Sequence, residues 1–368
     1  MIKVVHLSSL HSRYDTRIFV KMCVSLSRAG YQVTYIVADG KGVEEVEGVK
    51  IIDVGLRAPG RLTRMRQTSR QVMYGAVEQD ADVYHVHDPE LIPVGLRLKR
   101  LGKIVIFDAH EDLPEQIKNK AYLHPLVRSI LSKSSDWYQK RTCARFDAII
   151  AATPLIASKF IDINAESVNV NNFPILDEIE YNDDWSDRRS GATYLGGMAA
   201  VRGIKEIIRA IALTPGTRLN LAGKFSESDT EAEVKSYPEW GCINELGFLD
   251  RDQVKALLSR SICGLVVLHP ISNYIDALPV KMFEYMASGL PVIASDFPLW
   301  RDIVEGNKCG LCVDPLDVHA IANAIQYIVD HPEIAQEMGR NGRLAIEEKF
   351  NWSSESDKLL DLYGRLVN

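Results

Sequence analysis

The sequence predicts an α/β protein made of two doubly wound domains, each with a parallel sheet covered by helices on both faces. The chain of 368 residues is about the length of two domains of ordinary size. Short, unbroken apolar runs alternate with helical stretches along its whole length, and strands that are apolar on both faces are typical of parallel sheets. The same rhythm begins twice, which indicates two such sheets.

The first block of strands opens the chain, and helices fit between its strands. The helix predicted over 17–29 ends at Gly30, a residue type that favours the left-handed turn closing many helices. The predicted strands of this block are 2–7, 32–37, 49–54, 83–87, 104–109 and 147–152.

A second block repeats the pattern after an acidic, turn-rich stretch. We place the boundary there, with a first domain over 1–178 and a second over 179–351. The closing segment, 352–368, carries an apolar stripe at helical spacing that fits either domain. The predicted strands of the second block are 192–196, 217–223, 242–246, 264–268, 291–295 and 310–313, and its helices include 203–213, 251–260, 280–288 and 317–330.

Composition and charge exclude several classes of protein. A hydrophobic content of 46% with 25% charged residues is that of an ordinary globular chain, and the net charge of -6 argues against a nucleic-acid-binding surface. The opening strand is too short for the core of a signal peptide, and no window is apolar enough to span a membrane. We therefore expect a cytoplasmic protein whose six cysteines stay reduced.

Chemistry-bearing residues follow the strands of both blocks. In doubly wound sheets ligands lie beyond the carboxyl ends of the strands, so we expect the site in a central cleft that the two sheets face. The segments that follow strands and carry such residues are 87–90, 108–112, 196–203 and 223–224.

Several common catalytic motifs are absent. The loop after the first strand has no glycine-rich dinucleotide fingerprint, and the chain lacks a P-loop, an H-E-x-x-H zinc motif and a G-x-S-x-G nucleophile elbow. His85 and His87 share a strand, and we take their side chains to point to opposite faces, which makes them poor joint ligands. We therefore predict no metal site and no NAD cofactor.

The most informative segment is the run 276–295. We interpret it as a loop, a helix start and a buried strand, with Pro279 in the first helical turn. The backbone N–H groups of Val280 and Lys281 would then be free to bind an anion such as a pyrophosphate. Glu284, one turn later, is placed to accept hydrogen bonds from two ribose hydroxyls. The alternative is an ordinary amphipathic helix with Lys281 and Glu284 in solvent.

This segment resembles the donor-binding motif of retaining glycosyltransferases of family 4, which have the GT-B fold. The family carries an acidic residue, seven residues and a Glu ahead of a Met-Ala-x-Gly-x-Pro-Val run, and here the two acids are Asp276 and Glu284. The similarity covers nearly the whole chain, and its opening resembles members that act in surface-polysaccharide assembly. Further matching segments are 6–9 with 15–19, 194–203, 246–249, and 350–352, which begins a helix that crosses back to the first domain.

The resemblance implies a role for each residue of the donor site. Glu284 is implied to hold the nucleotide ribose, and Asp276 stands where the family usually has a longer Glu that contacts the donor sugar. His110 matches the family histidine beside the anomeric carbon, so His110 and Asp276 are the predicted catalytic residues. The implied donor-binding residues are Gly197, Arg202, Val280, Lys281, Glu284, Phe248 and Leu249.

The phosphate-binding loop departs from the family pattern. The family usually has an Arg directly after the first Gly of the 194–203 loop and a Lys five residues later, and here those places hold Gly197 and Arg202. Arg202 can grip phosphate oxygens with two N–H groups. We hypothesise that Lys281 supplies the second positive charge.

The implied reaction transfers a sugar from a nucleotide diphosphate sugar, of UDP or GDP type, to a glycan or a polyprenyl-diphosphate-linked acceptor in capsule, exopolysaccharide or lipopolysaccharide assembly. Attack on the front face retains the anomeric configuration, and cationic side chains with helix N–H groups stabilise the diphosphate without a metal. Asp15, Arg17, His87 and Asp88 are assigned to the acceptor side. A GT-B sugar-nucleotide 2-epimerase and a non-catalytic, two-lobe sugar-binding protein are the alternatives.

Two basic stretches, 57–70 and 118–145, contain interspersed apolar residues. Such surfaces suit anionic lipid headgroups or a lipid-diphosphate acceptor, which predicts peripheral contact with the cytoplasmic face of the inner membrane. A solvated helix face is the alternative. The basic residues are Arg57, Arg61, Arg64, Arg66 and Arg70 in the first stretch and Lys118, Lys120, Arg128, Lys133, Lys140, Arg141 and Arg145 in the second.

Overall fold

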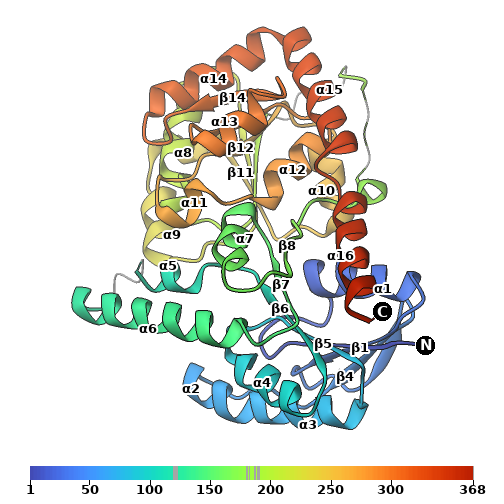
Figure 1. Cartoon of the computed structure of the whole chain (residues 1–368). Coiled ribbons are helices and arrows are strands. Elements are labelled where there is room, and N and C mark those ends of the chain that lie inside the picture. The colour runs from blue at the N-terminus through green and yellow to red at the C-terminus, as the bar shows by residue number, and fades with distance from the viewer. Residues whose placement is uncertain (119–122, 180, 182, 186–187, 189–190, 368) are drawn as a thin grey trace. The chain divides into compact units, whose positions relative to one another are not determined.

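The computed structural model describes residues 1–118, 123–179, 181, 183–185, 188 and 191–367, with Arg61 described by its backbone alone. The contacts between residues divide the chain into two compact units (Figure 1). Unit 1 comprises Met1–Asn172 and Trp352–Asn368, and unit 2 comprises Phe173–Asn351. The chain thus first leaves unit 1 a few residues before the boundary predicted at residue 178.

Unit 1 is built on an eight-stranded sheet in the order β3-β4-β2-β1-β5-β6-β7-β8. Neighbouring strands are parallel except β3 and β4, which are antiparallel. The predicted strands are present to within about two residues, and β3 and β8 are additional. The strands are β1 (Lys3–Leu7), β2 (Gln32–Val37), β3 (Glu44–Val46), β4 (Val49–Asp53), β5 (Val83–Val86), β6 (Ile104–Ala109), β7 (Ala148–Ala151) and β8 (Ser167–Asn169).

Helices cover both faces of this sheet. α3 and α4 pack side by side against β1, β2, β5 and β6, while α1 and η1 pack against β2 (Figure 1). The helical segments of unit 1 are η1 (Thr16–Cys23), α1 (Val24–Arg28), α2 (Arg61–Thr63), η2 (Arg64–Thr68), α3 (Ser69–Gln79), η3 (Pro89–Leu91), α4 (Ile92–Arg100), α5 (Leu113–Lys118), α6 (Pro125–Cys143), α7 (Pro154–Ile161) and α16 (Trp352–Val367).

The helix predicted over 17–29 is present as two consecutive segments, η1, which is π-helical, and α1. Asp15 caps the start, because its carboxylate accepts hydrogen bonds from the N–H groups of Arg17 and Ile18. The helix closes before Gly30, which has a φ of 89°. Single π-helical turns are frequent at functional sites, and this one carries the buried side chain of Arg17.

The closing helix, α16, is part of unit 1 and packs on η1. Trp352 donates its indole N–H to Ser25 at 2.9 Å. The carboxylate of Glu355, almost fully buried, accepts hydrogen bonds from the backbone and side chain of Asn171 at 2.8 and 3.1 Å. These contacts hold α16 against α1 and against the segment that follows β8.

Unit 2 is built on a six-stranded, fully parallel sheet in the order β11-β10-β9-β12-β13-β14. The prediction of two α/β domains with parallel sheets is therefore confirmed. The strands are β9 (Ala192–Leu195), β10 (Leu219–Ala222), β11 (Ile243–Gly247), β12 (Cys263–Val266), β13 (Val292–Ser295) and β14 (Gly310–Val313).

Two apolar cores lie on the two faces of this sheet. One contains α8 and α14, and the other contains α12 and α13. The helical segments of unit 2 are η4 (Leu176–Glu178), η5 (Ala200–Arg202), α8 (Ile204–Ala212), α9 (Ser228–Lys235), η6 (Pro238–Cys242), α10 (Arg251–Leu258), α11 (Ser272–Ile275), α12 (Val280–Ala287), α13 (Pro298–Val304), α14 (Val318–Asp330) and α15 (Pro332–Glu348).

The start of α12 is held at the carboxyl ends of the strands by two contacts. The hydroxyl of Tyr285, fully buried, accepts the backbone N–H of Leu195 at 2.9 Å. Only glycine fits beneath that ring, because a Cβ on Gly264 would lie 2.2 Å from it. Trp300 donates to the carbonyl of Ala277 at 2.7 Å and anchors the loop that leads into the helix.

Candidate functional site

The carboxyl ends of β5 and β6 bring buried ionisable side chains together in unit 1. Asp108, near the end of β6, is fully buried. Arg17 of η1 meets it with two parallel hydrogen bonds, in which Nε donates to Oδ2 at 2.9 Å and Nη2 to Oδ1 at 2.8 Å. The remaining amino group of Arg17 donates to the carbonyl of Val170 at 2.8 Å. The buried carboxylate is thus neutralised by a bidentate partner, the strongest form of such a pair.

Two histidines complete the surroundings of Asp108. His110 Nε2 lies 2.8 Å and His87 Nδ1 lies 3.2 Å from Asp108 Oδ2. Burial alone would raise the pKa of Asp108, but the charge of Arg17 and the hydrogen bonds from the histidines hold it well below its ordinary value. Burial lowers the pKa of His87 to about 4, although Asp108 opposes this shift. At neutral pH an anionic Asp108 therefore accepts a hydrogen bond from a neutral His87.

A second group, joined by His11, contains the other two residues assigned to the acceptor side. His11 Nδ1 lies 3.1 Å from Asp15, and its Nε2 lies 3.5 Å from Asp88. Burial alone would lower the pKa of His11, but the hydrogen bond to Asp15 and the charge of Asp88 raise it. The ring of His11 is 4.9 Å from that of His110, so the four predicted residues belong to one connected region of unit 1.

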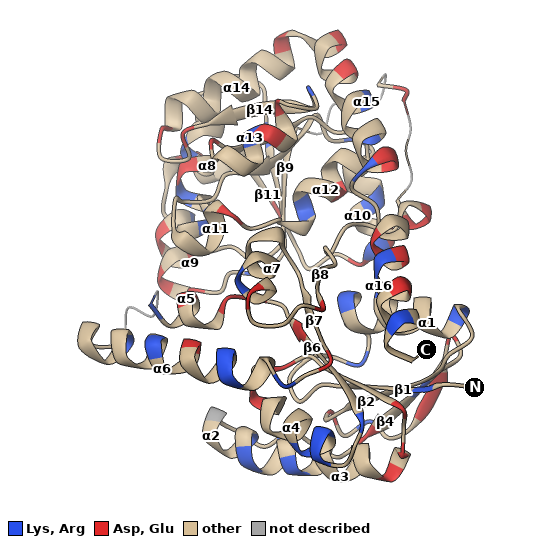
Figure 2. Cartoon of the chain, viewed as in Figure 1, with Lys and Arg blue, Asp and Glu red and all other residues tan. Residues whose placement is uncertain are grey.

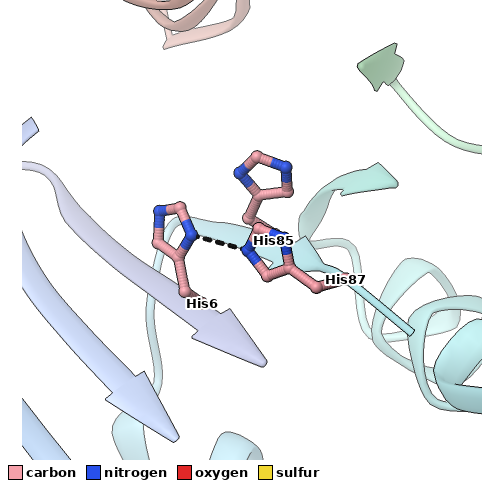
Figure 3. Close-up of side chains that lie close together, drawn as sticks. All are labelled: His6, His85 and His87. Atoms are coloured by element: carbon pink, nitrogen blue, oxygen red, sulfur yellow. Dashed lines mark hydrogen bonds between the residues drawn. The ribbon is translucent and has the colours of Figure 1, made fainter. Parts of the chain in front are cut away.

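His6, His85 and His87 lie on the same face of the sheet (Figure 3). The expectation that His85 and His87 point to opposite faces is wrong, because residues two apart on a strand share a face. Their ring centroids are 4.4 Å apart. His6, which stands beside His85 in the register of β1 and β5, joins them, with its Nδ1 2.8 Å from His87 Nε2. The period-two spacing was the signal that could have found this cluster.

The spacing of these nitrogens matches hydrogen bonding better than metal binding. Two nitrogens on one tetrahedral zinc, each bonded at about 2.05 Å, stand roughly 3.3 Å apart, whereas His6 and His87 are 2.8 Å apart. Around Asp108, the guanidinium of Arg17 already occupies both carboxylate oxygens. Neither group, in the part of the chain that the structure describes, therefore has the geometry of a preformed metal site.

Unit 2 brings two cations together beside an aromatic ring. Arg202, in η5, donates Nη1 to the carbonyl of Gly197 at 3.1 Å, and the hydroxyl of Tyr194 donates to the same oxygen at 2.8 Å. Lys281, near the start of α12, places its Nζ 3.6 Å from the centroid of the Tyr194 ring. This Nζ is buried and has no hydrogen-bond partner among the described residues. We call Arg202, Lys281, Tyr194 and Gly197 the cation cluster.

The electrostatics of the cation cluster favour a bound anion. Burial, with a further contribution from Arg202, lowers the pKa of Lys281 well below its ordinary value, and Glu284 only partly opposes the shift. The first N–H groups of α12, those of Val280 and Lys281, have no acceptor within the helix. A side chain on Gly197 would start 2.9 Å from Arg202 Nη1, so glycine here leaves room for the guanidinium.

The other predicted donor-site residues of unit 2 lie on α12 and on the loops that follow α11 and β11. Glu284, half-buried, is one helical turn beyond Lys281, and Asp276, also half-buried, follows α11. Phe248 follows β11 with 76% of its surface exposed, and Lys224 Nζ lies 5.9 Å from its ring. Leu249 instead packs against the core.

The structure describes most residues of the two predicted basic stretches. In 57–70, Arg64 donates to both carboxylate oxygens of Glu90 at 2.8 and 3.0 Å, and Arg57 donates to the carbonyl of Leu10. In 118–145, Lys120 lies outside the described residues, as does the side chain of Arg61 in the first stretch. No helix in the described part of the chain is both long and apolar enough to cross a bilayer.

Two protein families match consecutive parts of the chain. Residues 16–170 match the family described as Glycosyltransferase Family 4, and residues 184–345 match the one described as Glycosyl transferases group 1. Among curated proteins, the glycogen synthase of Mycobacterium tuberculosis is 23% identical over 175 residues, which is 46% of this chain and 41% of that protein. The match thus spans less than half the length of this relative.

Solved structures share the whole architecture. Sucrose-phosphate synthase from Thermosynechococcus elongatus has a TM-score of 0.81 at 19% identity and covers 100% of this chain and 99% of its own. Anabaena HepE, solved in complex with UDP-glucose, has a TM-score of 0.75 at 15% identity, with 99% and 100% covered. With both halves of the sequence matched as well, the chain belongs to the family 4, group 1 glycosyltransferases with the GT-B fold.

Proposed function

We propose that the protein is a retaining glycosyltransferase whose unit 2 binds the diphosphate of a nucleotide-sugar donor at the cation cluster. The observation that carries the proposal is the buried amine of Lys281, which lacks a hydrogen-bond partner among the described residues and stands close to a second cation. A buried cation without a partner is unfavourable, and a diphosphate would supply the missing acceptors and negative charge.

Each residue of unit 2 has a distinct part in this proposal. Arg202 and Lys281, with the N–H groups at the start of α12, hold the diphosphate and stabilise the charge that grows on it as the bond to the sugar breaks. Glu284 accepts hydrogen bonds from the ribose, and the exposed ring of Phe248 stacks on the base. Asp276 contacts a hydroxyl of the donor sugar. HepE was solved with UDP-glucose, which favours a UDP-sugar as the first donor to test.

Unit 1 contributes His110 and the acceptor side. Because His110 Nε2 donates to Asp108 at 2.8 Å, the ring orientation is set and Nδ1 remains for a sugar hydroxyl. Asp15, Arg17, His87 and Asp88 belong to the region that shapes the acceptor side, of which Arg17 and His87 act through Asp108. We propose a glycan or lipid-linked acceptor in surface-glycan assembly.

Calorimetric titration with UDP and GDP tests the donor site. We expect Lys281→Met to weaken binding of the preferred nucleotide by at least about tenfold, because a desolvated charge-assisted contact to phosphate is lost. Lys255→Met, at a partly exposed position of α10, is the matched control and should bind as the native protein does. Equal affinity of both variants would remove Lys281 from the site.

Product analysis without acceptor separates transfer from 2-epimerisation, since an epimerase converts the sugar nucleotide alone.

We further propose that α6 docks on an anionic membrane that presents the acceptor. The distribution of polar and apolar residues on this helix is the reverse of that usual for a surface helix. It buries Ser132 and Gln139. The exposed fractions of Leu126, Ile130 and Trp137 are 68%, 64% and 64%. Lys and Arg residues are spaced along it (Figure 2). Exposed apolar side chains between cations suit a lipid interface of negative charge.

Flotation with vesicles tests this docking. We expect the protein to float with vesicles that contain anionic lipid and to be released by salt, and to ignore purely zwitterionic vesicles. Ile130→Ser combined with Trp137→Ser should abolish flotation and leave nucleotide binding intact. Leu316→Ser, at an exposed apolar position of unit 2, is the control. Salt-independent flotation, or none, would contradict the proposal.

A further inference from the structure

We propose that a directed chain of hydrogen bonds, formed by three buried histidines and by Tyr363 of α16, ends on Asp108 and makes Tyr363 a positioning residue for His110. The proposal rests on the proposed function only in that His110 takes part in sugar transfer. In the direction in which the protons are donated, the members are His85, Tyr363, His6, His87 and Asp108.

The Asp108 end sets the direction of the chain. An ionised carboxylate can only accept hydrogen bonds, so His87 Nδ1, 3.2 Å from Oδ2, must carry its proton. His110 Nε2 donates to the same oxygen at 2.8 Å, which explains why these two ring nitrogens also lie 3.3 Å from each other. Burial keeps His87 neutral by lowering its pKa to about 4, so its second nitrogen, Nε2, is an acceptor.

The next link follows from that tautomer. His6 Nδ1 lies 2.8 Å from His87 Nε2, and the two ring planes differ by only 17° (Figure 3). Since His87 Nε2 is the acceptor, His6 Nδ1 carries the proton. Burial also lowers the pKa of His6 well below its ordinary value. The other nitrogen of His6 is therefore an acceptor as well.

Tyr363 of α16 connects His6 to His85. Its hydroxyl lies 3.5 Å from His6 Nε2, the longest link, and 2.9 Å from His85 Nδ1. The hydroxyl donates its hydrogen bond to His6 and accepts one from His85 Nδ1. His85 Nε2 is therefore unprotonated and carries a lone pair. That nitrogen is buried and has no partner among the described residues, as expected for the end of a one-way chain.

The chain matters for His110 because a change at Tyr363 is transmitted to Asp108. Without the Tyr363 hydroxyl, His6 Nε2 loses its donor and His85 Nδ1 loses its acceptor. The carboxylate of Asp108 still requires a proton on His87 Nδ1, and hence on His6 Nδ1, but the His6 ring is no longer held at its other nitrogen. The rings of His6 and His87 are then free to shift relative to Asp108, so the surroundings that orient His110 are altered without any change to His110 itself.

NMR of the full-length protein with ¹⁵N-labelled histidine reads the tautomers directly. We expect N–H on Nδ1 in His6, His85 and His87 and on Nε2 in His110. Tyr363→Phe should give His85 a mixture of tautomers, because its Nδ1 loses its acceptor, and should move the resonances of His6 and His87 while both keep N–H on Nδ1. Tyr31→Phe is the matched control, because Tyr31 packs edge-on against Tyr363 at 5.8 Å and its hydroxyl is not a member of the chain. An Nε2 proton on native His87, spectra unmoved by Tyr363→Phe, or chelator-reversible shifts of all three rings with added zinc would overturn the chain.

Turnover tests the positioning role separately. We expect Tyr363→Phe to lower kcat about tenfold, as the loss of contacts behind a site residue does elsewhere, with the donor KM unchanged, and Tyr31→Phe to leave both unchanged. A purely structural Tyr363 would lower the Tm yet leave tautomers and kcat at native values. Native tautomers need no turnover to be measured, so a protein without transferase activity would refute the proposed function and leave the chain standing.

Discussion

The two ionisable clusters of the molecule balance their charges in opposite ways. In unit 1 the carboxylate of Asp108 is met by the guanidinium of Arg17, and burial keeps His87 neutral. In unit 2 Arg202 and Lys281 stand together, and the buried amine has no hydrogen-bond partner among the described residues. A cluster that is complete by itself holds the fold and orients its members. A cluster with an excess of positive charge instead indicates that its ligand is negatively charged.

Removing one partner from the complete cluster should have the largest effect. Arg17→Met leaves a buried carboxylate without its cation, and we expect the free energy of unfolding of unit 1 to fall by about 3–5 kcal/mol. Urea denaturation with hydrogen exchange followed in β6 measures it. The control is Arg28→Met, which breaks an exposed pair with Glu47 and should cost about 0.5 kcal/mol or less. Equal costs would mean that Asp108 is not neutralised by Arg17.

Acid should unfold unit 1 before it affects the cation cluster. Burial lowers the pKa values of His6, His85 and His87, so below pH about 6.5 the unfolded chain binds protons that the folded unit refuses. Stability therefore falls as the pH is lowered from about 6.5 toward 4, by up to about 1.4 kcal/mol per pH unit for each histidine.

Unfolding measured at several pH values checks this slope, and His85→Phe should remove one histidine's share of it. The group with the opposite sign is His11, whose raised pKa contributes stability that is lost as the pH rises. A stability of unit 1 that stays constant between pH 6.5 and 4.5 would contradict neutral, buried histidines.

Nucleotide binding should depend on pH through Lys281. Its pKa is lowered in the free protein, and a bound diphosphate raises it, so binding takes up a proton. Affinity should therefore fall as the pH rises from the lowered pKa of the free protein toward the higher pKa of the complex, by at most about tenfold per pH unit, which is the limit for one linked proton. Titration calorimetry in buffers of different ionisation enthalpy counts that proton. Lys281→Met should bind weakly with no proton uptake, and native-like uptake in this variant would assign the proton to another group.

The sequence predicted the fold and the outer parts of the sites because those features are local. Apolar runs with turn residues between them mark the strands, and the start of α12 could be placed from Pro279 and the residues that follow. The contacts that complete the clusters join residues far apart in the chain. Arg17 and Asp108 are 91 positions apart, and His6 and Tyr363 are 357 apart. No spacing rule in a single sequence connects such residues.

The burial of Lys281 is a second feature that the sequence alone could not predict. Its place at a helix start predicted an anion site, but solvent exposure of the side chain was an equally good interpretation of the sequence. The choice between them depends on the ring of Tyr194, which β9 places 3.6 Å from Nζ. Which face of α12 meets β9 follows from the packing of Tyr285 beneath it, and this packing is settled only in three dimensions.

The smallest expected effect concerns the stability of unit 2. Its sign is expected to be opposite to that of Arg17→Met in unit 1. Lys281→Met removes a desolvated cation and keeps the length of the side chain, so we expect the free energy of unfolding of unit 2 to stay constant or rise by about 1 kcal/mol. Thermal unfolding without nucleotide measures it, with Lys255→Met, at a partly exposed position, as the control. Saturating nucleotide should reverse the order, because binding stabilises the native protein in proportion to ligand concentration over Kd. A destabilised, ligand-free Lys281→Met would mean that the lysine already has its counter-charge within the protein, and the excess charge that distinguishes unit 2 from unit 1 would not exist.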